Sequence, residues 1–306
     1  MISMPLIYPS YLPAPTQAPL QAPIHDNNQT REDGMGARLY SETGVKPINY
    51  AICIHTPLHG DRYTPLYITE YIEMQLALGV DHITFYVTED ERNMAVRRVL
   101  DFYKRLGVVT QIRWPIAQAL APAHVWYMGQ LITVQDCLYR SIAAGVQHLA
   151  QHDLDELIIP AQKTTLGQLV STLWSQTPQA CGFHLIPVLH YSDAERADSI
   201  FNATQTYKLD GSNFMKQLTK PLVKPERIFE LGIHHISKQL HEGQHSQTCP
   251  EDIALMHHYS SRFSPTTLQP MNVEPERDLI LSHSAFVRQT ARTVLEHLTM
   301  TDEATR

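Results

Sequence analysis

Segments with strand periodicity alternate with segments of helical periodicity through the first half of this sequence, and that order limits the possible folds more than any other feature. Strand-length apolar or alternating runs occupy residues 49–56, 83–87, 108–114 and 146–152. The first intervening helix has clear end signals, because Thr64 can cap its start, Pro65 fits its first position and Gly79 can end it. Strands that alternate with helices of this length predict an α/β fold with a mostly parallel central sheet flanked by helices.

The chain is long enough for one large domain with tails. Six of its first 23 residues are proline, so residues 1–45 are predicted to form a disordered or extended arm. We expect a catalytic domain over residues 46–280, with one long strand at residues 181–190. Residues 281–306 are predicted to form a C-terminal helical tail.

Charge composition excludes one class of partner. The chain has 24 Lys and Arg against 31 Asp and Glu, a formal net charge of -7, and its basic residues are scattered. No basic footprint for nucleic acid is present, so nucleic acid is not an expected partner. An acidic chain that holds an anionic substrate needs a local positive charge, from a bound cation or from a few placed Lys and Arg.

The cysteines form no C-x-x-C pair; they are Cys53, Cys137, Cys181 and Cys249. Three stand in apolar contexts, which predicts small buried side chains in a reducing compartment, although the even count leaves an oxidising lumen open. His241, His245 and Cys249 have a spacing that would suit zinc on a helix. Gly243 and its polar neighbours favour a loop, so zinc binding at this segment stays open.

Two aspartates follow the fourth predicted strand. In extended backbone, residues i and i+2 point to the same side, so Asp153 and Asp155 can converge on one ion while Leu154 turns into the core. Carboxylate pairs suit Mn²⁺ or Mg²⁺, which leave positions open for phosphate oxygens. Such an ion would link Asp153 to a diphosphate and stabilise the charge on a departing nucleoside diphosphate. A solvated acidic turn is the alternative interpretation.

The residues around this pair resemble a known family. The string QHDLDELIIP at residues 151–160 resembles the D-x-D-E signature of glycosyltransferase family 92, with its following hydrophobic residues and proline. Other blocks resemble the family in the correct order, over about residues 50–260; they are residues 71–73, 78–86, 129–130, 135–140, 224–227, 232–234 and 257–259.

This resemblance implies a GT-A fold, a nucleotide-sugar donor, commonly UDP-galactose in animal members, and inversion at the anomeric carbon. No run approaches the roughly 20 apolar residues that span a bilayer. The sequence therefore predicts a cytoplasmic protein without a transmembrane segment, and leaves peripheral membrane contact open. A bacterial-type role in polysaccharide biosynthesis fits that location, and the Golgi lumen is the alternative if the chain is a fragment of an anchored protein.

Further residues are candidates by resemblance and position. GT-A enzymes often complete the metal shell with a histidine, and the resemblance places His234 and His258 in that role. Lys224 and Arg227 could contact the diphosphate or an acidic acceptor, or form an exposed salt bridge on a solvated turn. By analogy, Gln130 and Asp136 are placed near the donor sugar.

A general base and contacts to the nucleoside are also expected at the site. Inverting transfer needs a general base, and Asp193, near Glu195 after the strand at residues 181–190, is our candidate. Thr56 and Asp90 follow the first and second strands, at the sheet edge where nucleoside contacts tend to fall.

The expected function is metal-dependent transfer of a hexose from a nucleotide-diphosphate sugar, such as a UDP-sugar, to a carbohydrate or glycoconjugate hydroxyl. A metal-dependent phosphohydrolase would use the same acids and histidines, but would normally show a second acidic cluster. A noncatalytic carbohydrate-binding protein on the same fold would lose cation dependence.

Overall fold

The computed structural model describes residues 48–89, 92, 94–115, 125–160, 164–191, 199–200, 207–209, 218–260, 270–271 and 277–304. Pro47–Arg306 forms one compact unit. The predicted arm lies outside the described residues, as do Asp90, Asp193 and Glu195.

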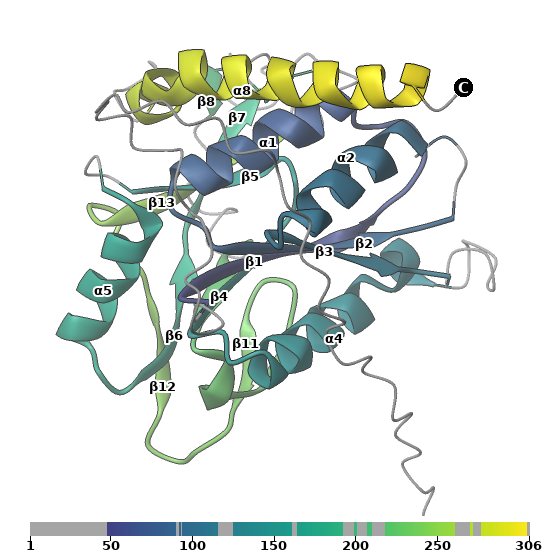
Figure 1. Cartoon of the computed structure of the whole chain (residues 1–306). Coiled ribbons are helices and arrows are strands. Elements are labelled where there is room, and N and C mark those ends of the chain that lie inside the picture. Colours follow the sequence, from purple (N-terminus) through teal and green to yellow (C-terminus); the bar gives the residue numbers. More distant parts are fainter. Residues whose placement is uncertain are drawn as a thin grey trace, which may run out of the picture. The chain divides into compact units, whose positions relative to one another are not determined.

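A seven-stranded sheet forms the centre of this unit (Figure 1). In order across the sheet, its strands are β12 (His245–Thr248), β6 (Ala180–Leu185), β9 (Lys220–Val223), β4 (His148–His152), β1 (Tyr50–Leu58), β2 (His82–Val87) and β3 (Val109–Arg113). Neighbouring strands are parallel except where β9 pairs with β4 and β6. The predicted α/β fold with a mostly parallel central sheet is therefore confirmed.

A second, five-stranded sheet follows the order β14 (Pro270–Met271), β8 (Tyr207–Leu209), β7 (Pro187–Tyr191), β13 (Ala254–Ser260) and β5 (Glu156–Pro160). The prediction of one strand over residues 181–190 is wrong, because β6 and β7 belong to different sheets. The break falls at Ile186, whose carbonyl accepts from the Met256 amide, and at Pro187, which has no N–H to continue a ladder. A short hairpin joins β10 (Ile228–Leu231) to β11 (Ile236–Gln239).

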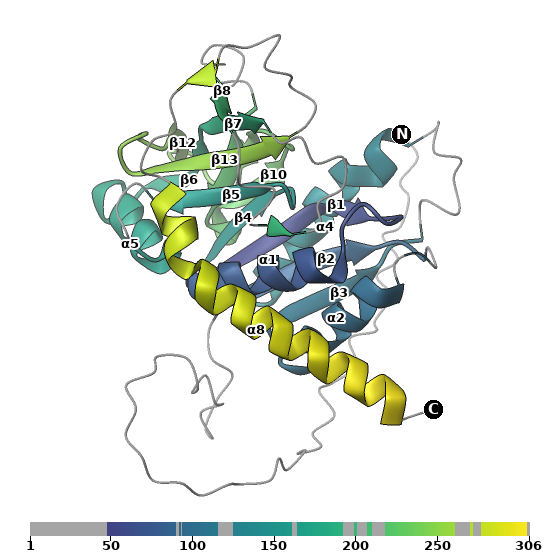
Figure 2. The same cartoon turned by 90° about the horizontal axis from the view of Figure 1, so that it is seen from above.

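Helices cover both faces of the central sheet (Figure 1). They are α1 (Pro65–Ala77), α2 (Met94–Arg105), α4 (Gln130–Ala143), α5 (Leu166–Gln176) and α8 (Arg277–Ala304), with the 3-10 turns η3 (Trp126–Gly129) and η4 (Pro225–Arg227). The predicted ends of α1 are confirmed, because the Thr64 hydroxyl accepts from the Tyr67 amide and Gly79 has a φ of 93°. The predicted C-terminal helix packs along α1 and α2 (Figure 2).

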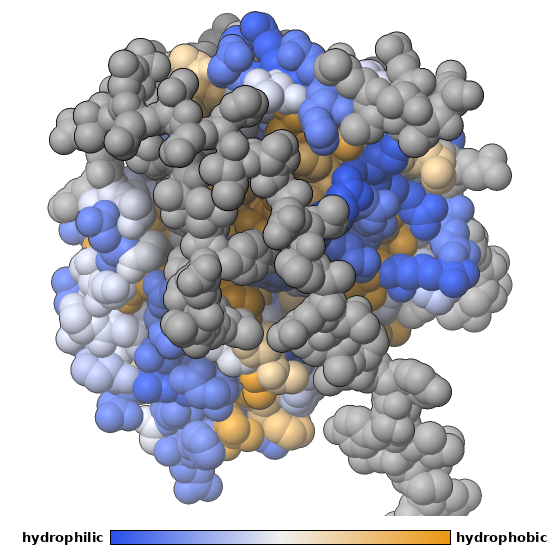
Figure 3. Space-filling view, viewed as in Figure 1, coloured by the Kyte–Doolittle hydropathy of each residue, from blue (hydrophilic) through white to orange (hydrophobic). Residues whose placement is uncertain are grey.

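The apolar core lies in two clusters that share strand β1. Ile52 and Ile54 pack with α1 and α2, whereas Ala51 and Cys53 pack with α4, as the alternation of side chains along a strand requires. On the face shown in Figure 3, hydrophilic residues form much of the coloured surface and apolar residues show between them. Among the described residues, no helix is long and apolar enough to cross a membrane.

Packing of α4 against β1 also joins two cysteines that stand 84 residues apart. Cys53 and Cys137 form a disulfide in the core between these elements. This bridge differs from the expected small thiols of a reducing compartment and agrees with the alternative that the even cysteine count left open. Cys181 and Cys249 are buried and free, as small apolar-like side chains should be.

Candidate functional site

The carboxyl ends of β1 and β4 meet where the strand order reverses. From β1 the chain moves outward through β2 and β3, and α4 then returns it to β4 on the other side of β1. Ligands of open α/β sheets bind at such a switch point. Because Ile54 pairs with His152, the next residues, His55 and Thr56 on β1 and Asp153 after β4, lie together at this edge.

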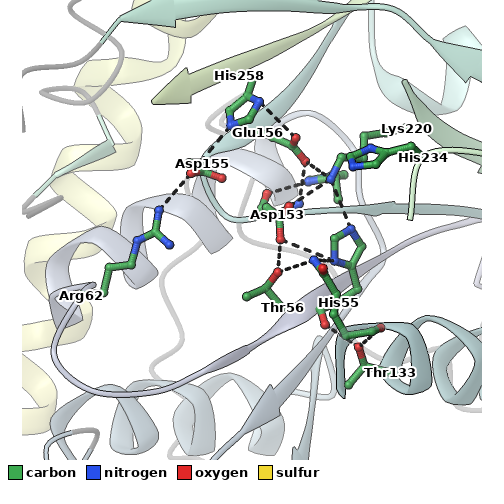
Figure 4. A network of polar contacts seen from close by, with 12 residues as sticks. His55, Thr56, Arg62, Thr133, Asp153, Asp155, Glu156, Lys220, His234 and His258 are labelled. Atoms are coloured by element: carbon green, nitrogen blue, oxygen red, sulfur yellow. Dashed lines mark hydrogen bonds and ion pairs between the residues drawn. The ribbon is translucent and has the colours of Figure 1, made fainter. Parts of the chain in front are cut away.

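Asp153 and Asp155 lie in a tight turn between β4 and β5. The Glu156 amide donates to the Asp153 carbonyl at 3.2 Å, and the Asp153 amide donates to the Glu156 carboxylate at 2.8 Å. The predicted extended backbone is therefore wrong, since the turn aims the two aspartates at different partners (Figure 4). Leu154 is buried as predicted, and its carbonyl accepts from the Tyr67 hydroxyl at 2.9 Å.

The Asp153 carboxylate is held by neighbours from two strands, β1 and β9. One oxygen accepts from the Thr56 hydroxyl, and the other accepts from the Lys220 ammonium at 3.0 Å (Figure 4). Burial alone would raise the pKa of Asp153, but Lys220, His55 and the Thr56 hydrogen bond lower it below its ordinary value. Asp153 is therefore ionised and fixed in orientation, and its side chain is still 25% exposed.

Helix α4 supports this arrangement through its first turn. The Gln130 amide donates to the Thr56 hydroxyl at 2.7 Å and lies 2.9 Å from His55 Nδ1. The Thr133 hydroxyl donates to the His55 carbonyl. Burial lowers the pKa of His55 to about 4, although Asp153 opposes the shift, so the imidazole is neutral near pH 7.

Lys220 is the buried cation of the site, at 1% exposure. Leu222 and Val223 of β9 pair with Ala150 and Leu149 of β4 in antiparallel order, so the first residue of β9 lies beside the last residues of β4. Lys220 Nζ donates to Glu156 Oε2 at 3.0 Å as well as to Asp153. Burial would lower its pKa, but the two carboxylates outweigh burial and raise it.

Asp155 has a different set of neighbours. Its Oδ2 is 3.1 Å from the Arg62 guanidinium and 3.9 Å from His258 Nε2. Burial raises the pKa of Asp155, His258 and Arg62 oppose the shift, and the neighbouring Asp153 and Glu156 carboxylates add to it. This carboxylate has less cationic compensation than Asp153, because its direct cation, Arg62, has a side chain 46% exposed.

The donor atoms suit a divalent cation at Asp155 and His258. Carboxylate oxygen with a single imidazole is a ligand set for Mn²⁺, and Mg²⁺ also binds through one or two carboxylates plus substrate phosphates. No group of three His, Cys, Asp or Glu in the described part of the chain is placed to hold a metal ion. The third candidate, Asp153, faces Lys220 instead.

Three other predicted residues have clear places relative to this site. Thr56 and Gln130 contact it directly. His234 lies beside Lys220 (Figure 4), but its Nδ1 is 3.2 Å from the Thr219 carbonyl and burial lowers its pKa.

Other predicted residues are not brought to the carboxylates. Lys224 and Arg227 follow the far end of β9, where the Lys224 ammonium lies over the Trp174 ring and Arg227 donates to the carbonyls of Pro178 and Ala180. Their predicted contact with the diphosphate is corrected, because β9 runs antiparallel to β4. It carries both residues away from the carboxylates, toward the amino end of β4.

Asp136 is also engaged elsewhere. Its carboxylate accepts from the Tyr86 hydroxyl at 2.7 Å and from Arg140 at 2.6 Å, on a part of α4 beyond the first turn. The segment of His241, His245 and Cys249 holds no metal-ligand group among the described residues, and β12 begins at His245 rather than a helix.

Five residues of the site labelled in Figure 4 were not predicted: His55, Arg62, Thr133, Glu156 and Lys220. Arg62 had a usable signal, because it lies in the loop after the first strand, at the edge where Thr56 was placed. Glu156 directly follows the aspartate pair. For Lys220 the signal was only weak, since it is a lysine at the start of a short apolar run.

Comparison with protein families and curated proteins gives two matches. The model of glycosyltransferase family 92 matches residues 48–296. The beta-1,4-galactosyltransferase galt-1 of Caenorhabditis elegans is 25% identical over 230 residues, which cover 74% of this chain and 52% of that protein. The chain thus spans about half the length of this curated relative.

Two solved structures show a distant likeness. A 4-diphosphocytidyl-2C-methyl-D-erythritol synthase is 13% identical with a TM-score of 0.33, covering 68% of this chain and 96% of that chain. An apo UDP-glucose pyrophosphorylase is 7% identical with a TM-score of 0.31, covering 79% of this chain and 99% of that chain.

Proposed function

The chain belongs to glycosyltransferase family 92, and we propose that it transfers a hexose from a nucleotide-diphosphate sugar to a carbohydrate or glycoconjugate hydroxyl. The proposed donor is a UDP-sugar, with UDP-galactose as the first choice because the curated relative is named a galactosyltransferase. A divalent cation, Mn²⁺ or Mg²⁺, belongs to the proposal.

One observation carries this proposal: the Asp153–Glu156 turn stands at the switch point of the sheet, beside Thr56 at the end of β1. At that edge a donor would meet an ionised, fixed Asp153 and a half-exposed Arg62. The Arg62 guanidinium suits a diphosphate, since it can donate two parallel hydrogen bonds to phosphate oxygens.

Transfer with inversion is one displacement. The acceptor oxygen forms a bond to the anomeric carbon as the bond from that carbon to the diphosphate oxygen breaks, and the electron pair leaves with the nucleoside diphosphate. The hydroxyl proton passes to a carboxylate base, for which Asp193, outside the described residues, is our candidate. A cation at Asp155 and His258 would stabilise charge on the departing diphosphate.

A thermal-shift screen of nucleotide sugars with and without Mn²⁺ tests the proposal. A donor that binds with metal raises the melting temperature by linkage. Asp155→Ala should abolish the shift, whereas Asp101→Ala, at an exposed position of α2, should keep it. Release of nucleoside diphosphate with a sugar acceptor present then measures transfer.

The outcomes separate the alternatives. Absence of any shift with every nucleotide sugar contradicts the proposal. A shift with no turnover indicates a binding protein, and an equal shift in Asp155→Ala removes Asp155 from the cation site.

A further inference from the structure

Lys220 is surrounded by side chains of the site and is not exposed to a substrate. An ammonium group has three donors, and Lys220 Nζ lies 3.0 Å from Asp153 Oδ2, 3.0 Å from Glu156 Oε2 and 3.4 Å from His55 Nε2. At 1% exposure it is also closed off from solvent. Its effect on a reaction must therefore pass through the residues that it holds.

The charge count of the cluster depends on this one side chain. Among the described residues of the site, the carboxylates are Asp153, Asp155 and Glu156, and the permanent cations are Lys220 and Arg62. Three carboxylates against two cations leave one net negative charge, and without Lys220 there would be two. His55 and His234 are neutral near pH 7, because burial lowers the pKa of each.

Lys220 also occupies oxygens that a cation would otherwise use. Asp153 Oδ2 and Glu156 Oε2 both accept from it, which leaves His258 and Asp155, whose own cation Arg62 is half-exposed, for an incoming ion. Two protein ligands in a cluster of one net negative charge form a weak site alone, and a diphosphate supplies the missing oxygens and charge.

We propose that Lys220 is a positioning residue that keeps the affinity of the unliganded protein for divalent cations low and fixes the Asp153 carboxylate for the incoming donor. The inference rests on the proposed function for the donor but not for the cation. It implies that cation and diphosphate bind together, with Lys220 as the residue that couples them.

A set of charge-changing variants, measured without nucleotide, tests whether Lys220 keeps the affinity for divalent cations low. The variants are Lys220→Met, Glu156→Gln and the double variant, and the readout is the Kd for Mn²⁺ alone, from titration calorimetry or the signal of free Mn²⁺. Loss of one nearby unit charge changes the affinity for a divalent ion by about tenfold, even at the dielectric constant of water. Lys220→Met should bind Mn²⁺ about tenfold more tightly and Glu156→Gln about tenfold more weakly.

The double variant separates charge from packing. It has the net charge of the natural cluster, so its Kd should return to within about threefold of the natural value. A purely structural role for Lys220 predicts instead that Mn²⁺ affinity does not rise in Lys220→Met and does not recover in the double variant. Either result overturns the proposal.

Folding of the single lysine variant is not required. Lys220→Met leaves the buried Glu156 carboxylate without its cation, which can unfold the protein. In that case, the double variant is compared with Glu156→Gln. Tighter Mn²⁺ binding in the double variant, by about tenfold, supports the proposal, and equal binding overturns it.

Fixing of Asp153 is tested by kinetics in the double variant. With cluster charge preserved and the Asp153 anchor lost, kcat for transfer should fall at least tenfold while the Kd for Mn²⁺ stays constant. An unchanged kcat overturns this part. Absence of transfer in the natural protein would contradict the proposed function alone, because the Mn²⁺ cycle needs no donor.

Discussion

His258 on β13 lies directly opposite Glu156 on β5, with its Nδ1 3.5 Å from Glu156 Oε1 and its Nε2 3.9 Å from Asp155 Oδ2. The antiparallel register of the two strands fixes this relationship. His234 has no such position, since its ring faces the Thr219 carbonyl. Register thus favours His258, which the family resemblance already slightly preferred over His234 because Tyr259 matches as well.

His258→Ala should therefore weaken Mn²⁺ binding in the presence of a nucleotide diphosphate by at least about tenfold, or about 1.4 kcal/mol. His234→Ala should change it much less, because its Nδ1 faces the Thr219 carbonyl and no ion pair joins its ring to a carboxylate among the described residues. Titration calorimetry with UDP present measures both. The reverse order of the two effects would contradict the assignment of His258.

Thr56 links the carboxylate turn to helix α4. Thr56→Val keeps the shape but removes the hydroxyl that donates to Asp153 and accepts from Gln130. We expect a loss of about 1 kcal/mol in the free energy of unfolding and a clear fall in transfer rate, since two polar groups lose partners. Thr56→Ser should retain most of both. Denaturant unfolding and initial rates give the comparison, and equal losses in the two variants would rule out the hydroxyl as the cause.

Local signals were sufficient for several elements of the fold. The cap at Thr64 and the left-handed Gly79 are local signals, and α1 begins directly after the first and ends just before the second. The end of β4 before Asp153 was also predicted, because an apolar run leads into acidic residues there. The predicted orientation of Asp153 and Asp155 was wrong, since the backbone turns between them.

The rest of the site could not be predicted, because it depends on pairing between strands that lie far apart in the sequence. Lys220 stands 67 residues after Asp153 and reaches it only because β9 inserts antiparallel between β4 and β6. Periodicity does not reveal the direction of a four-residue strand. The same antiparallel direction carries Lys224 away from the carboxylates, so a residue that was a candidate for diphosphate binding lies over Trp174 instead.

The disulfide gives a direct chemical prediction. Of the four cysteines, Cys181 and Cys249 are free and the other two are bridged. Protein made in an oxidising compartment and unfolded without reductant should therefore take up two alkyl groups, and four after reduction. Mass spectrometry of the alkylated protein counts them, and peptide mapping should assign the reduction-dependent pair to Cys53 and Cys137. Four alkyl groups before reduction would contradict the bridge.

The dependence of stability on pH tests the packing around His148, at the start of β4. The His148 ring packs on Trp174 at 4.8 Å, and its Nδ1 lies 3.0 Å from the Asn49 carbonyl. Burial lowers the pKa of His148 to about 4, the Asn49 contact opposes the shift, and the charges of Lys224 and Arg227 add to it.

Because this folded-state pKa is below the unfolded value of 6.5, the unfolded chain binds a proton more readily. The contribution of His148 to stability is therefore complete above pH 6.5 and is lost as the pH falls toward 4. One such group changes the free energy of unfolding by at most about 1.4 kcal/mol per pH unit. His148→Gln should flatten the profile in that window while leaving the slope from His55 in place, because burial also lowers the pKa of that residue. Urea unfolding at half-unit steps between pH 4 and pH 7 measures both slopes. Parallel profiles for the variant and the natural protein would show that His148 titrates alike in both states.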